Sequence, residues 1–591
     1  MSTRRGPAAL LLVLLLAALT GCVSIPTSGP VDKVEGQQPT CQSCVNVEVA
    51  PPYPGDTGRE VVEGFLRANA NYQSGYAVAR QFLTRDAAST WTTDQGVVIY
   101  SVKPNKRPDV EGSVRLQGQR VGSLDKRNTF KAAKLPLDYT FELVREGGEW
   151  RISNPLPGLL VRDSSFERLY RSYNLYYPGG TGALVPEPIY LPDLRAPGNI
   201  ASALVQALLA GPSDWLSPAV QTAVPSGTKL SVDSVTIVNG VAQVPLSDEV
   251  QRTTDPERAS LAAQLVYTLQ QVTGVKKVLL QVGGQPFRVP QSDSTDLAVP
   301  LESISSELNP VPFVPSEQLY AVRGPKSVLQ KVTVNTDVPA MDPFPGPLGE
   351  GRYSISSLAA TVTNTEVAVV TDEDTVLRRT AVTGGRLTTV LDGVTSLLRP
   401  QFTRAGELFA VGVQNGQQRM WVTNPDGETR AISASDVFSH GRVVAFRISP
   451  DGARMALIMK SAGKTQLATA RVVRSPKLVV DGWRLLETDS PLTDAAVIDA
   501  RDLAWTSATE LVVLGADRAD GSYGQTAVSV DASTVQTQLK TSDWEAVELA
   551  VLLRTQTAIT LVLARDGAAY RDEGNRWLEI LDDTQAIAYP G

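Results

Sequence analysis

The sequence predicts a multidomain protein in which α+β domains are followed by an all-β propeller. At roughly 150 residues per domain, 591 residues make about three to four domains. The 46 glycines and 39 prolines supply many turns, which suit short strands better than long helices. A strand-and-turn pattern also recurs along residues 316–591. These features argue against an all-helical bundle and favour a fold class of α+β and all-β domains.

The charge and histidine content argue against two broad classes of function. The chain has 55 lysine and arginine residues against 62 aspartate and glutamate residues, a net charge of −7, and no basic block stands out. The electrostatic footprint of a nucleic-acid-binding protein is therefore missing. His440 is the single histidine, so a histidine-based metal site or catalytic triad has almost no residues to draw on. We expect no metal and no cofactor.

Residues 1–21 have the pattern of a bacterial lipoprotein signal peptide. Arg4 and Arg5 form a short basic region, an apolar run of 12 residues occupies positions 8–19, and Thr20-Gly21-Cys22 follows. This ending matches a lipobox, which predicts cleavage between Gly21 and Cys22 and acylation of the Cys22 thiol. The alternative is a plain secretory signal with a chance cysteine. Acyl chains such as palmitate hold a protein on a bilayer, so we expect a lipid-anchored chain on the extracytoplasmic face of the cell membrane.

Residues 22–57 have the composition of a flexible tether. They are rich in proline, glycine, serine and glutamine, and they lack helical or strand periodicity. Cys41 and Cys44 lie within this tether. A redox-active pair would need a helix start after Cys44, and a zinc site would need two more ligands nearby. In an oxidising compartment we therefore predict a local disulfide between Cys41 and Cys44.

Residues 58–165 are predicted to form an α+β domain. Thr57-Gly58-Arg59-Glu60 has the capping-box pattern of a helix start. An amphipathic segment over 76–83 follows, and strand patterns then end in a strict alternation over 137–143 before the turn Gly147-Gly148. Helices followed by a curved antiparallel sheet resemble an NTF2-like domain. The stretch has no histidine and no evident carboxylate pair, so we predict a structural role for it.

Residues 166–300 are predicted to form a compact α/β domain. A helix face over 200–208 stops at Gly211-Pro212, and Asn239-Gly240 predicts a hairpin. Asp255-Pro256 predicts the N-cap and first residue of a second helix. This domain resembles the GerMN domain of sporulation and cell-envelope proteins in three segments, 208–212, 223–228 and 264–269. The resemblance implies a fold and gives no chemistry.

Residues 301–315 are predicted to be a linker, and 316–591 to form the propeller. Thr403, Ser449 and Thr506 occupy equivalent points before a tight turn and a hydrophobic strand, and Thr363 fits more loosely. Weaker copies near both ends of this region predict about six blades, with seven possible. The sequence Ser449-Pro450-Asp451-Gly452 has the chemistry of a tight turn. We predict that it serves the closure of the blades.

The lipobox, the GerMN-like domain and the propeller occur in an order that resembles the LpqB family of actinobacterial lipoproteins over nearly the whole chain. The resemblance implies an accessory protein of the cell envelope that acts with the MtrA/MtrB two-component system. It implies two partners, the membrane that holds the lipid anchor and the extracellular domain of an MtrB-like sensor histidine kinase. From the charge and the missing catalytic motifs, we expect no contact with nucleic acid and no enzyme activity.

Two other functions stay open on the sequence alone. The chain could bind a cell-wall polymer without signalling, which exposed aromatic side chains in the clefts of the α+β domains would favour. It could also be a carboxylate-dependent hydrolase or lyase, because two carboxylates that meet across a propeller channel need no histidine. The serine-nucleophile and phosphate-binding motifs are not assembled. His440 lies between two predicted blades, where we expect it on the surface.

Overall fold

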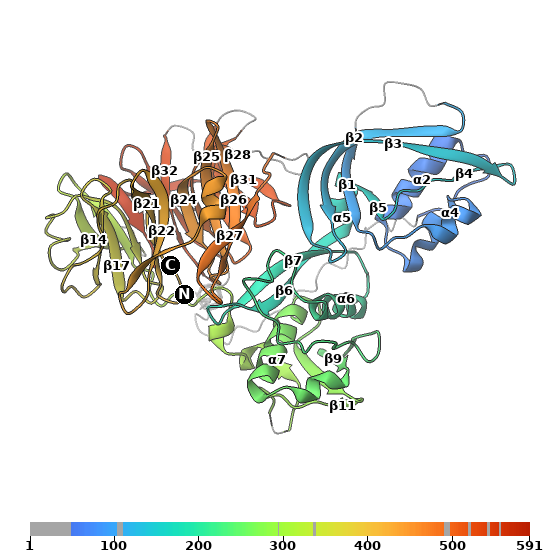
Figure 1. Ribbon diagram of the computed structural model, residues 1–591, viewed down its shortest axis with the longest axis horizontal. Coiled ribbons are helices and arrows are strands. Elements are labelled where there is room, and N and C mark those ends of the chain that lie inside the picture. Colours follow the sequence, from blue (N-terminus) through green and yellow to red (C-terminus); the bar gives the residue numbers. More distant parts are fainter. Residues whose placement is uncertain are drawn as a thin grey trace, which may run out of the picture. The chain divides into compact units, whose positions relative to one another are not determined.

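The computed structural model describes residues 49–102, 110–293, 295–334, 339–489, 497–517, 522–540, 544–554 and 557–591. Val49–Gly591 form one compact unit, in which an N-terminal α+β domain, a GerMN-like domain and a propeller follow one another along the chain (Figure 1). Within these ranges no helix has the length and apolarity that a bilayer crossing needs. Gly21, Cys22, Cys41 and Cys44 lie outside the described residues, so their predicted roles stay predictions.

The N-terminal domain begins with the helix that the sequence predicts. At its start the Thr57 backbone N–H donates to the Glu60 carboxylate at 2.8 Å, and the Glu60 N–H donates to the Thr57 hydroxyl. The amphipathic segment after it forms only the short helix α3, because Tyr76 has a positive φ and Phe82 is the C-cap. The helices are α2 (Gly58–Ala70), η1 (Ser74–Tyr76), α3 (Ala77–Gln81), α4 (Arg85–Thr90) and α5 (Asp163–Leu169).

A five-stranded sheet follows these first helices, as the sequence predicts. Its order is β4-β3-β2-β1-β5, and its pairs are antiparallel except for β1 beside β5. Aromatic side chains fill the interior of the domain: the Phe65 ring lies 5.3 Å from Trp91 and 6.2 Å from Phe141. The strands are β1 (Val97–Val102), β2 (Ser113–Leu124), β3 (Phe130–Glu146), β4 (Glu149–Ile152) and β5 (Leu159–Arg162).

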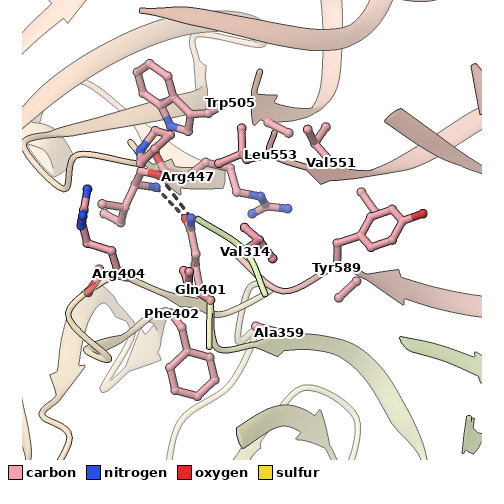
Figure 2. A pocket seen from close by; sticks show the side chains of 18 of the residues that line it. Val314, Ala359, Gln401, Phe402, Arg404, Arg447, Trp505, Val551, Leu553 and Tyr589 are labelled. Atoms are coloured by element: carbon pink, nitrogen blue, oxygen red, sulfur yellow. Dashed lines mark hydrogen bonds between the residues drawn. The ribbon is translucent and has the colours of Figure 1, made fainter. Parts of the chain in front are cut away.

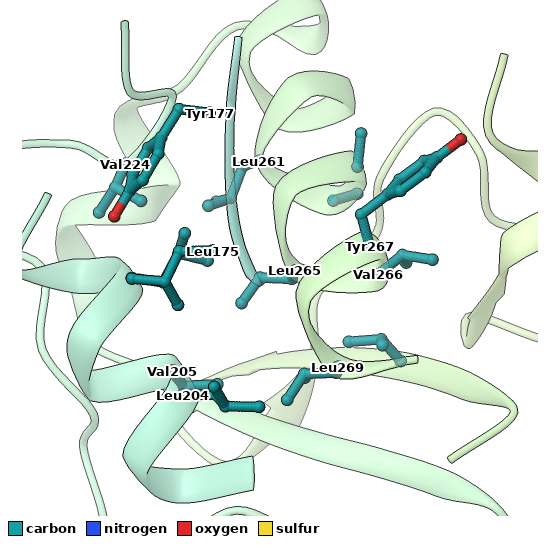
Figure 3. Close-up of a cluster of buried hydrophobic side chains, with 14 of the residues drawn as sticks. Leu175, Tyr177, Leu204, Val205, Val224, Leu261, Leu265, Val266, Tyr267 and Leu269 are labelled. Atoms are coloured by element: carbon teal, nitrogen blue, oxygen red, sulfur yellow. The ribbon is translucent and has the colours of Figure 1, made fainter. Parts of the chain in front are cut away.

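The GerMN-like domain combines a two-stranded ribbon, β6–β7, with a second sheet of order β11-β10-β9-β8 and a short strand, β12, beside β10. The helix α7 connects the parallel strands β9 and β10, and its apolar residues lie in the buried cluster of Figure 3. The elements are β6 (Tyr170–Pro178), β7 (Leu184–Pro192), α6 (Pro197–Leu209), β8 (Thr236–Val238), β9 (Val241–Leu246), η2 (Asp248–Arg252), α7 (Asp255–Leu269), β10 (Lys277–Val282), β11 (Gln285–Pro286) and β12 (Val299–Pro300).

Two local predictions in this domain have different outcomes. Asn239 and Gly240 both have positive φ and join β8 to β9, which confirms the predicted hairpin. The predicted N-cap of the second helix is wrong by one residue, because Thr254 is the N-cap and Asp255 is the first helical residue. The physical reason is a capping box: the Thr254 N–H donates to the Glu257 carboxylate at 2.7 Å, and only the spacing from 254 to 257 permits this pair.

In the described residues, the propeller has six blades of four antiparallel strands each. Each blade is a consecutive meander except the one that holds both ends of the domain, where β36 pairs with β13. A strand from the C-terminus therefore closes the ring, and the predicted count of about six blades is confirmed. The blades are β36 (Thr584–Ala588) with β13 (Leu319–Arg323), β14 (Val328–Thr333) and β15 (Ala340–Pro343); β16 (Ile355–Ala360), β17 (Glu366–Thr371), β18 (Val376–Ala381) and β19 (Thr388–Leu391); β20 (Gln401–Phe402), β21 (Leu408–Gln414), β22 (Gln417–Thr423) and β23 (Thr429–Ile432); β24 (Arg442–Ile448), β25 (Arg454–Ser461), β26 (Lys464–Val473) and β27 (Val479–Leu485); β28 (Val497–Trp505), β29 (Glu510–Asp517), β30 (Tyr523–Ser529) and β31 (Val535–Lys540); and β32 (Ala546–Leu552), β33 (Ile559–Ala564), β34 (Ala569–Asp572) and β35 (Trp577–Leu581).

The repeated hydroxyl residues mark the turn between the first and second strands of a blade. The backbone N–H groups of Thr403, Ser449 and Thr506 each donate to a carbonyl near the start of the second strand, at 2.8 to 3.0 Å. The fourth equivalent residue is Thr361, which makes the same bond at 3.0 Å, so the prediction of Thr363 is wrong by two residues. Thr361 directly follows the last residue of β16, whereas Thr363 bonds only within the turn, to the Thr365 hydroxyl.

Candidate functional site

Innermost strands of the blades line a central channel, and each has one edge without a neighbouring strand. Such an edge leaves backbone N–H groups that need other partners. Three side chains provide them, each reaching the inner strand of the following blade. Gln401 accepts from the Ile448 N–H at 2.6 Å, Asp502 accepts from a backbone N–H at 2.8 Å, and Glu548 accepts from one at 3.4 Å. These polar side chains therefore join neighbouring blades.

Four charged side chains meet in a buried cluster at the middle of the channel. Arg399 Nη1 lies 2.6 Å from Glu548 Oε1 and 3.4 Å from Asp502 Oδ2. Arg447 Nη2 lies 3.2 Å from Asp502 Oδ1. The side chains are 8 to 16% exposed. Buried charges need such complete pairing, because an unpaired charge in a low-dielectric interior is strongly destabilising.

Burial controls the protonation of the two channel carboxylates. Loss of solvent raises the pKa of Glu548 to about 7, and the Arg399 guanidinium opposes this rise. Burial also raises the pKa of Asp502, again against Arg399. The sequence left open a carboxylate pair across the channel, whereas Asp502 and Glu548 lie on the inner strands of adjacent blades, β28 and β32, and both contact Arg399. Both carboxylates, however, are bound to arginine and to backbone N–H groups.

The charged cluster divides the channel into two small cavities. One, of about 140 Å³, is lined by residues early in the inner strands, among them Ser357, Val444 and Glu548. The other, of about 80 Å³, is lined by residues later in these strands, with Gln401, Trp505 and Tyr589 around it (Figure 2).

The linker and the C-terminus narrow the mouth beside this smaller cavity. Val314 of the linker and the terminal residue Gly591 both line it. Arg404 holds the linker by donating to the carbonyls of Asn309 at 2.6 Å and Glu307 at 2.8 Å. The Gly591 N–H donates to a carbonyl at the end of β16 at 3.2 Å. Both segments therefore belong to the packed propeller.

The Ser449–Gly452 turn is the centre of a docking face between the propeller and the GerMN-like domain. Asp451 is fully buried, and its carboxylate accepts from the Ser449 hydroxyl at 2.6 Å and lies 3.4 Å from Arg454. Arg454 also donates to the Pro186 carbonyl of β7 at 2.6 Å, and Thr181 donates to the Asp451 carbonyl at 2.6 Å. Burial raises the pKa of Asp451, and Arg454 opposes this rise. The turn was predicted to serve blade closure, and this is a correction: β36 closes the ring, and the turn binds the neighbouring domain.

Two glycines permit the close approach at this face. Gly452 has φ +79°, and a Cβ there would lie 2.6 Å from the Thr181 side chain. A Cβ on Gly180, in the turn between β6 and β7, would lie 3.1 Å from Arg474. The glycine-rich segment 179–182 therefore functions as a contact surface.

Further contacts extend the docking face. Trp215 donates its indole N–H to the Gly482 carbonyl at 2.7 Å and accepts from Arg471 at its own carbonyl at 2.7 Å. Ala453 and Val473 of the propeller are buried in the same apolar cluster as the core of the GerMN-like domain. The two domains therefore share a hydrophobic core.

His440 lies where the sequence predicted it. It is exposed at the end of α8 (Ser435–Ser439), its ring stacks on Trp483 at 3.9 Å, and its Nδ1 lies 2.8 Å from the Asp436 carbonyl. Throughout the described part of the chain, no group of three or more histidine, cysteine, aspartate or glutamate side chains is arranged to hold a metal ion.

Comparisons with known proteins agree with the order of the domains. The family described as "Lipoprotein LpqB, N-terminal domain" matches residues 51–167, and "Lipoprotein LpqB beta-propeller domain" matches residues 332–590. The chain belongs to the LpqB lipoprotein family. The Germane family, described as "Sporulation and spore germination", matches residues 174–288 between them, which agrees with the GerMN-like fold.

Relatives of this family match almost the full chain. Lipoprotein LpqB of Cutibacterium acnes is 29% identical, with 96% of this chain and 97% of the relative covered. Lipoprotein LpqB of Streptomyces coelicolor is 28% identical, with 97% and 96% covered. Together with the lipobox at Cys22, membership of a lipoprotein family supports a membrane-anchored extracellular protein.

Solved structures resemble single parts of the chain. TolB from Acinetobacter baumannii is 12% identical over 60% of this chain and 87% of its own, with a TM-score of 0.32. The first GerMN domain of the sporulation protein GerM from Bacillus subtilis is 23% identical over 24% of this chain and 97% of its own, with a TM-score of 0.17. The domain folds given above rest on the strand order and register of the chain itself.

Proposed function

We propose that this chain is a non-catalytic accessory protein of the MtrA/MtrB two-component system, anchored to the outer face of the cell membrane. In this proposal its folded domains bind the extracellular part of the sensor kinase. The family membership and the lipobox support an anchored accessory lipoprotein. The kinase as partner comes from the family resemblance.

The observation that carries the proposal is the docking face around Asp451 and Arg454. Domains that share a core and a buried ion pair present one composite surface to a partner. A large fixed surface favours recognition of a protein over chemistry on a small molecule. Anchoring adds to this, since two proteins on the same membrane meet at a high effective concentration, and a modest interface then suffices.

The state of the channel carboxylates favours binding over catalysis. A general acid or base must reach the substrate with a free oxygen. Asp502 and Glu548 instead bond to arginine and to backbone N–H groups of the next blade. We therefore assign them to the assembly of the propeller.

The aromatic core of the N-terminal domain is not available to a wall polymer, whereas Tyr53 and Tyr72 of this domain are exposed. Stacking on a sugar needs an accessible aromatic face. Phe65, Trp91 and Phe141 are instead buried against one another. The aromatic core therefore gives no support to polymer binding.

Loss of the anchor tests the proposal. Cys22→Ala should abolish labelling by a fatty-acid analogue and should weaken the kinase output in cells, because the chain leaves the membrane. The double variant Cys41→Ala/Cys44→Ala is the matched control, since it removes thiols of the tether and keeps the acylation site. A Cys22→Ala chain that is released from the membrane and still supports full kinase output would contradict the proposal.

A further inference from the structure

A cavity of about 270 Å³ lies between the N-terminal domain and the GerMN-like domain. Its walls come from the turn between β2 and β3, from β6 and β7, and from α6 and the loop that follows it. The domains are firmly joined beside it: the Tyr190 N–H donates to the Asn128 carbonyl at 2.9 Å, and the Tyr190 ring packs on Phe130 and Phe166. The proposed function does not use this cavity.

Glu187 supplies a buried negative charge to the cavity wall. On β7 it shares one face with Ile189 and Leu191, and it pairs in register with Leu175 of β6. Every one of these residues lines the cavity. The Glu187 side chain therefore interrupts an otherwise apolar face. It is only 5% exposed.

The hydrogen bond that Glu187 accepts comes from a neutral group: its Oε2 accepts from the Ser213 backbone N–H at 3.0 Å. Within the described residues no arginine or lysine lies within ion-pair distance of it. Arg484 of β27 is a nearby cation, and the charge of Glu187 opposes the fall that burial causes in the Arg484 pKa, but no hydrogen bond joins the two side chains. Arg127, which also lines the cavity, directs its Nη1 to the carbonyls of Ala210, Gly211 and Pro212 at the end of α6. A buried carboxylate with a single neutral donor is a binding position for a cation.

The rim of the same cavity carries positive charge. Lys126 and Arg127 both line it and are exposed to solvent. Arg127 is held by the α6 carbonyls, and Lys126 is left to bind an anion at the mouth. The cavity thus combines an anion in its wall, a cation at its rim and an apolar surface made by Leu175, Ile189 and Leu191.

We propose that this cavity binds a free aliphatic amino acid. The ligand's ammonium group would bond to Glu187, its carboxylate would face Lys126 at the rim, and its side chain would pack on the apolar wall. The size agrees, because a 270 Å³ cavity lies just below the usual range of pockets for drug-sized ligands. Such a site adds a small-molecule ligand to a protein whose proposed partner is a kinase.

Calorimetric titration of the full chain in detergent tests this proposal. The probes are L-leucine and two half-blocked analogues, N-acetyl-L-leucine, which lacks the ammonium group, and L-leucinamide, which lacks the carboxylate. We expect L-leucine to bind, N-acetyl-L-leucine to lose at least tenfold in affinity, and L-leucinamide to lose a few-fold. Absence of binding for L-leucine at millimolar concentration overturns the proposal, as does equal binding of N-acetyl-L-leucine.

Variants separate recognition from folding. Glu187→Gln keeps an acceptor for the Ser213 N–H and removes the charge, so it should weaken L-leucine binding at least tenfold with little change in melting temperature. Lys126→Ala should weaken it a few-fold, and Lys276→Ala, an exposed lysine of the GerMN-like domain that does not line the cavity, is the matched control. Unchanged binding by a folded Glu187→Gln protein overturns the proposal. Contact with the kinase is measured separately, by crosslinking in cells. A protein that does not bind L-leucine but still crosslinks to the kinase would overturn the amino-acid proposal and leave the proposed function standing.

Discussion

The propeller channel and the cavity beside β7 both bury carboxylates, but they satisfy them differently. In the channel, Asp502 has two arginine partners and two backbone N–H donors, and Glu548 has one arginine and one backbone N–H. In the cavity, Glu187 has a single backbone N–H. Arginine side chains thus contact both channel carboxylates directly, whereas no cation of the described protein contacts Glu187, and Arg484 acts on it only through space. The difference separates a carboxylate that assembles the fold from one that can receive a ligand.

The largest expected effect comes from opening the ring that creates the channel. Deleting residues 584–591 removes β36, which leaves the edge of β13 unpaired and exposes the apolar faces of two blades. We expect an insoluble or degraded product, measured as soluble yield and by the loss of a sharp thermal transition. A truncated chain that melts as sharply as the full one would show that the channel does not depend on closure.

Removal of one channel carboxylate should be the next largest effect. Asp502→Ala leaves Arg399 and Arg447 with less compensation in a buried site, and breaking a buried ion pair in this way costs about 3 to 5 kcal/mol. Glu187→Gln should change the unfolding free energy by less than about 1 kcal/mol, because the Ser213 bond remains. Urea unfolding followed by tryptophan fluorescence measures both. Similar losses of unfolding free energy in Asp502→Ala and Glu187→Gln would contradict the account, because the two carboxylates would then be equally important to the fold.

The raised pKa of Glu548 predicts a dependence of stability on pH. Because the folded protein holds this proton to about pH 7 and the unfolded chain releases it near its ordinary value of 4.5, the stabilisation is present below pH 4.5. It is lost as the pH rises through 7, by on the order of 3 kcal/mol.

Glu548→Gln tests this dependence. It should flatten the fall in unfolding free energy between pH 5 and pH 8, as measured by urea titration at several pH values. Glu302→Gln, at an exposed residue of the linker, is the control and should keep the wild-type slope. A wild-type stability that rises over this pH range would contradict the assignment.

A smaller effect is expected at the docking face. Gly452 and Gly427 each end a turn with the sequence Pro-Asp-Gly, so the two positions can be compared. Gly452→Ala and Gly427→Ala both place a side chain at positive φ, +79° and +98°, which costs about 1 to 3 kcal/mol. Only Gly452 faces Thr181 of the other domain. Limited proteolysis should therefore cut the linker faster in Gly452→Ala than in Gly427→Ala. Equal cleavage would mean that the turn does not hold the domains together.

Local patterns in the sequence predicted much of the fold. The hairpin at Asn239-Gly240, the capping box at Thr57 and the repeated turns at Thr403, Ser449 and Thr506 each depend on residues close in sequence. The error in the N-cap of α7, predicted at Asp255 and found at Thr254, is also local. Two possible cap patterns overlap there and differ by one residue.

The sites depend on contacts that no local pattern contains. Arg399, Asp502 and Glu548 meet only because six blades close into a ring, and Thr181 meets Asp451 only through the docking of two domains. Glu187 had a local signal, as a charged residue on an alternating apolar face. That no arginine or lysine of the described protein contacts its carboxylate, however, is apparent only from the three-dimensional structure.

Crosslinking in intact cells tests the central claim most directly. A photoreactive residue placed on the exposed surface of the propeller or the GerMN-like domain should link this chain to the extracellular part of the sensor kinase, and the yield should fall when Cys22 is replaced by alanine. Crosslinks to wall polymer at these positions, with none to any sensor kinase, would contradict the account and favour the wall-binding alternative.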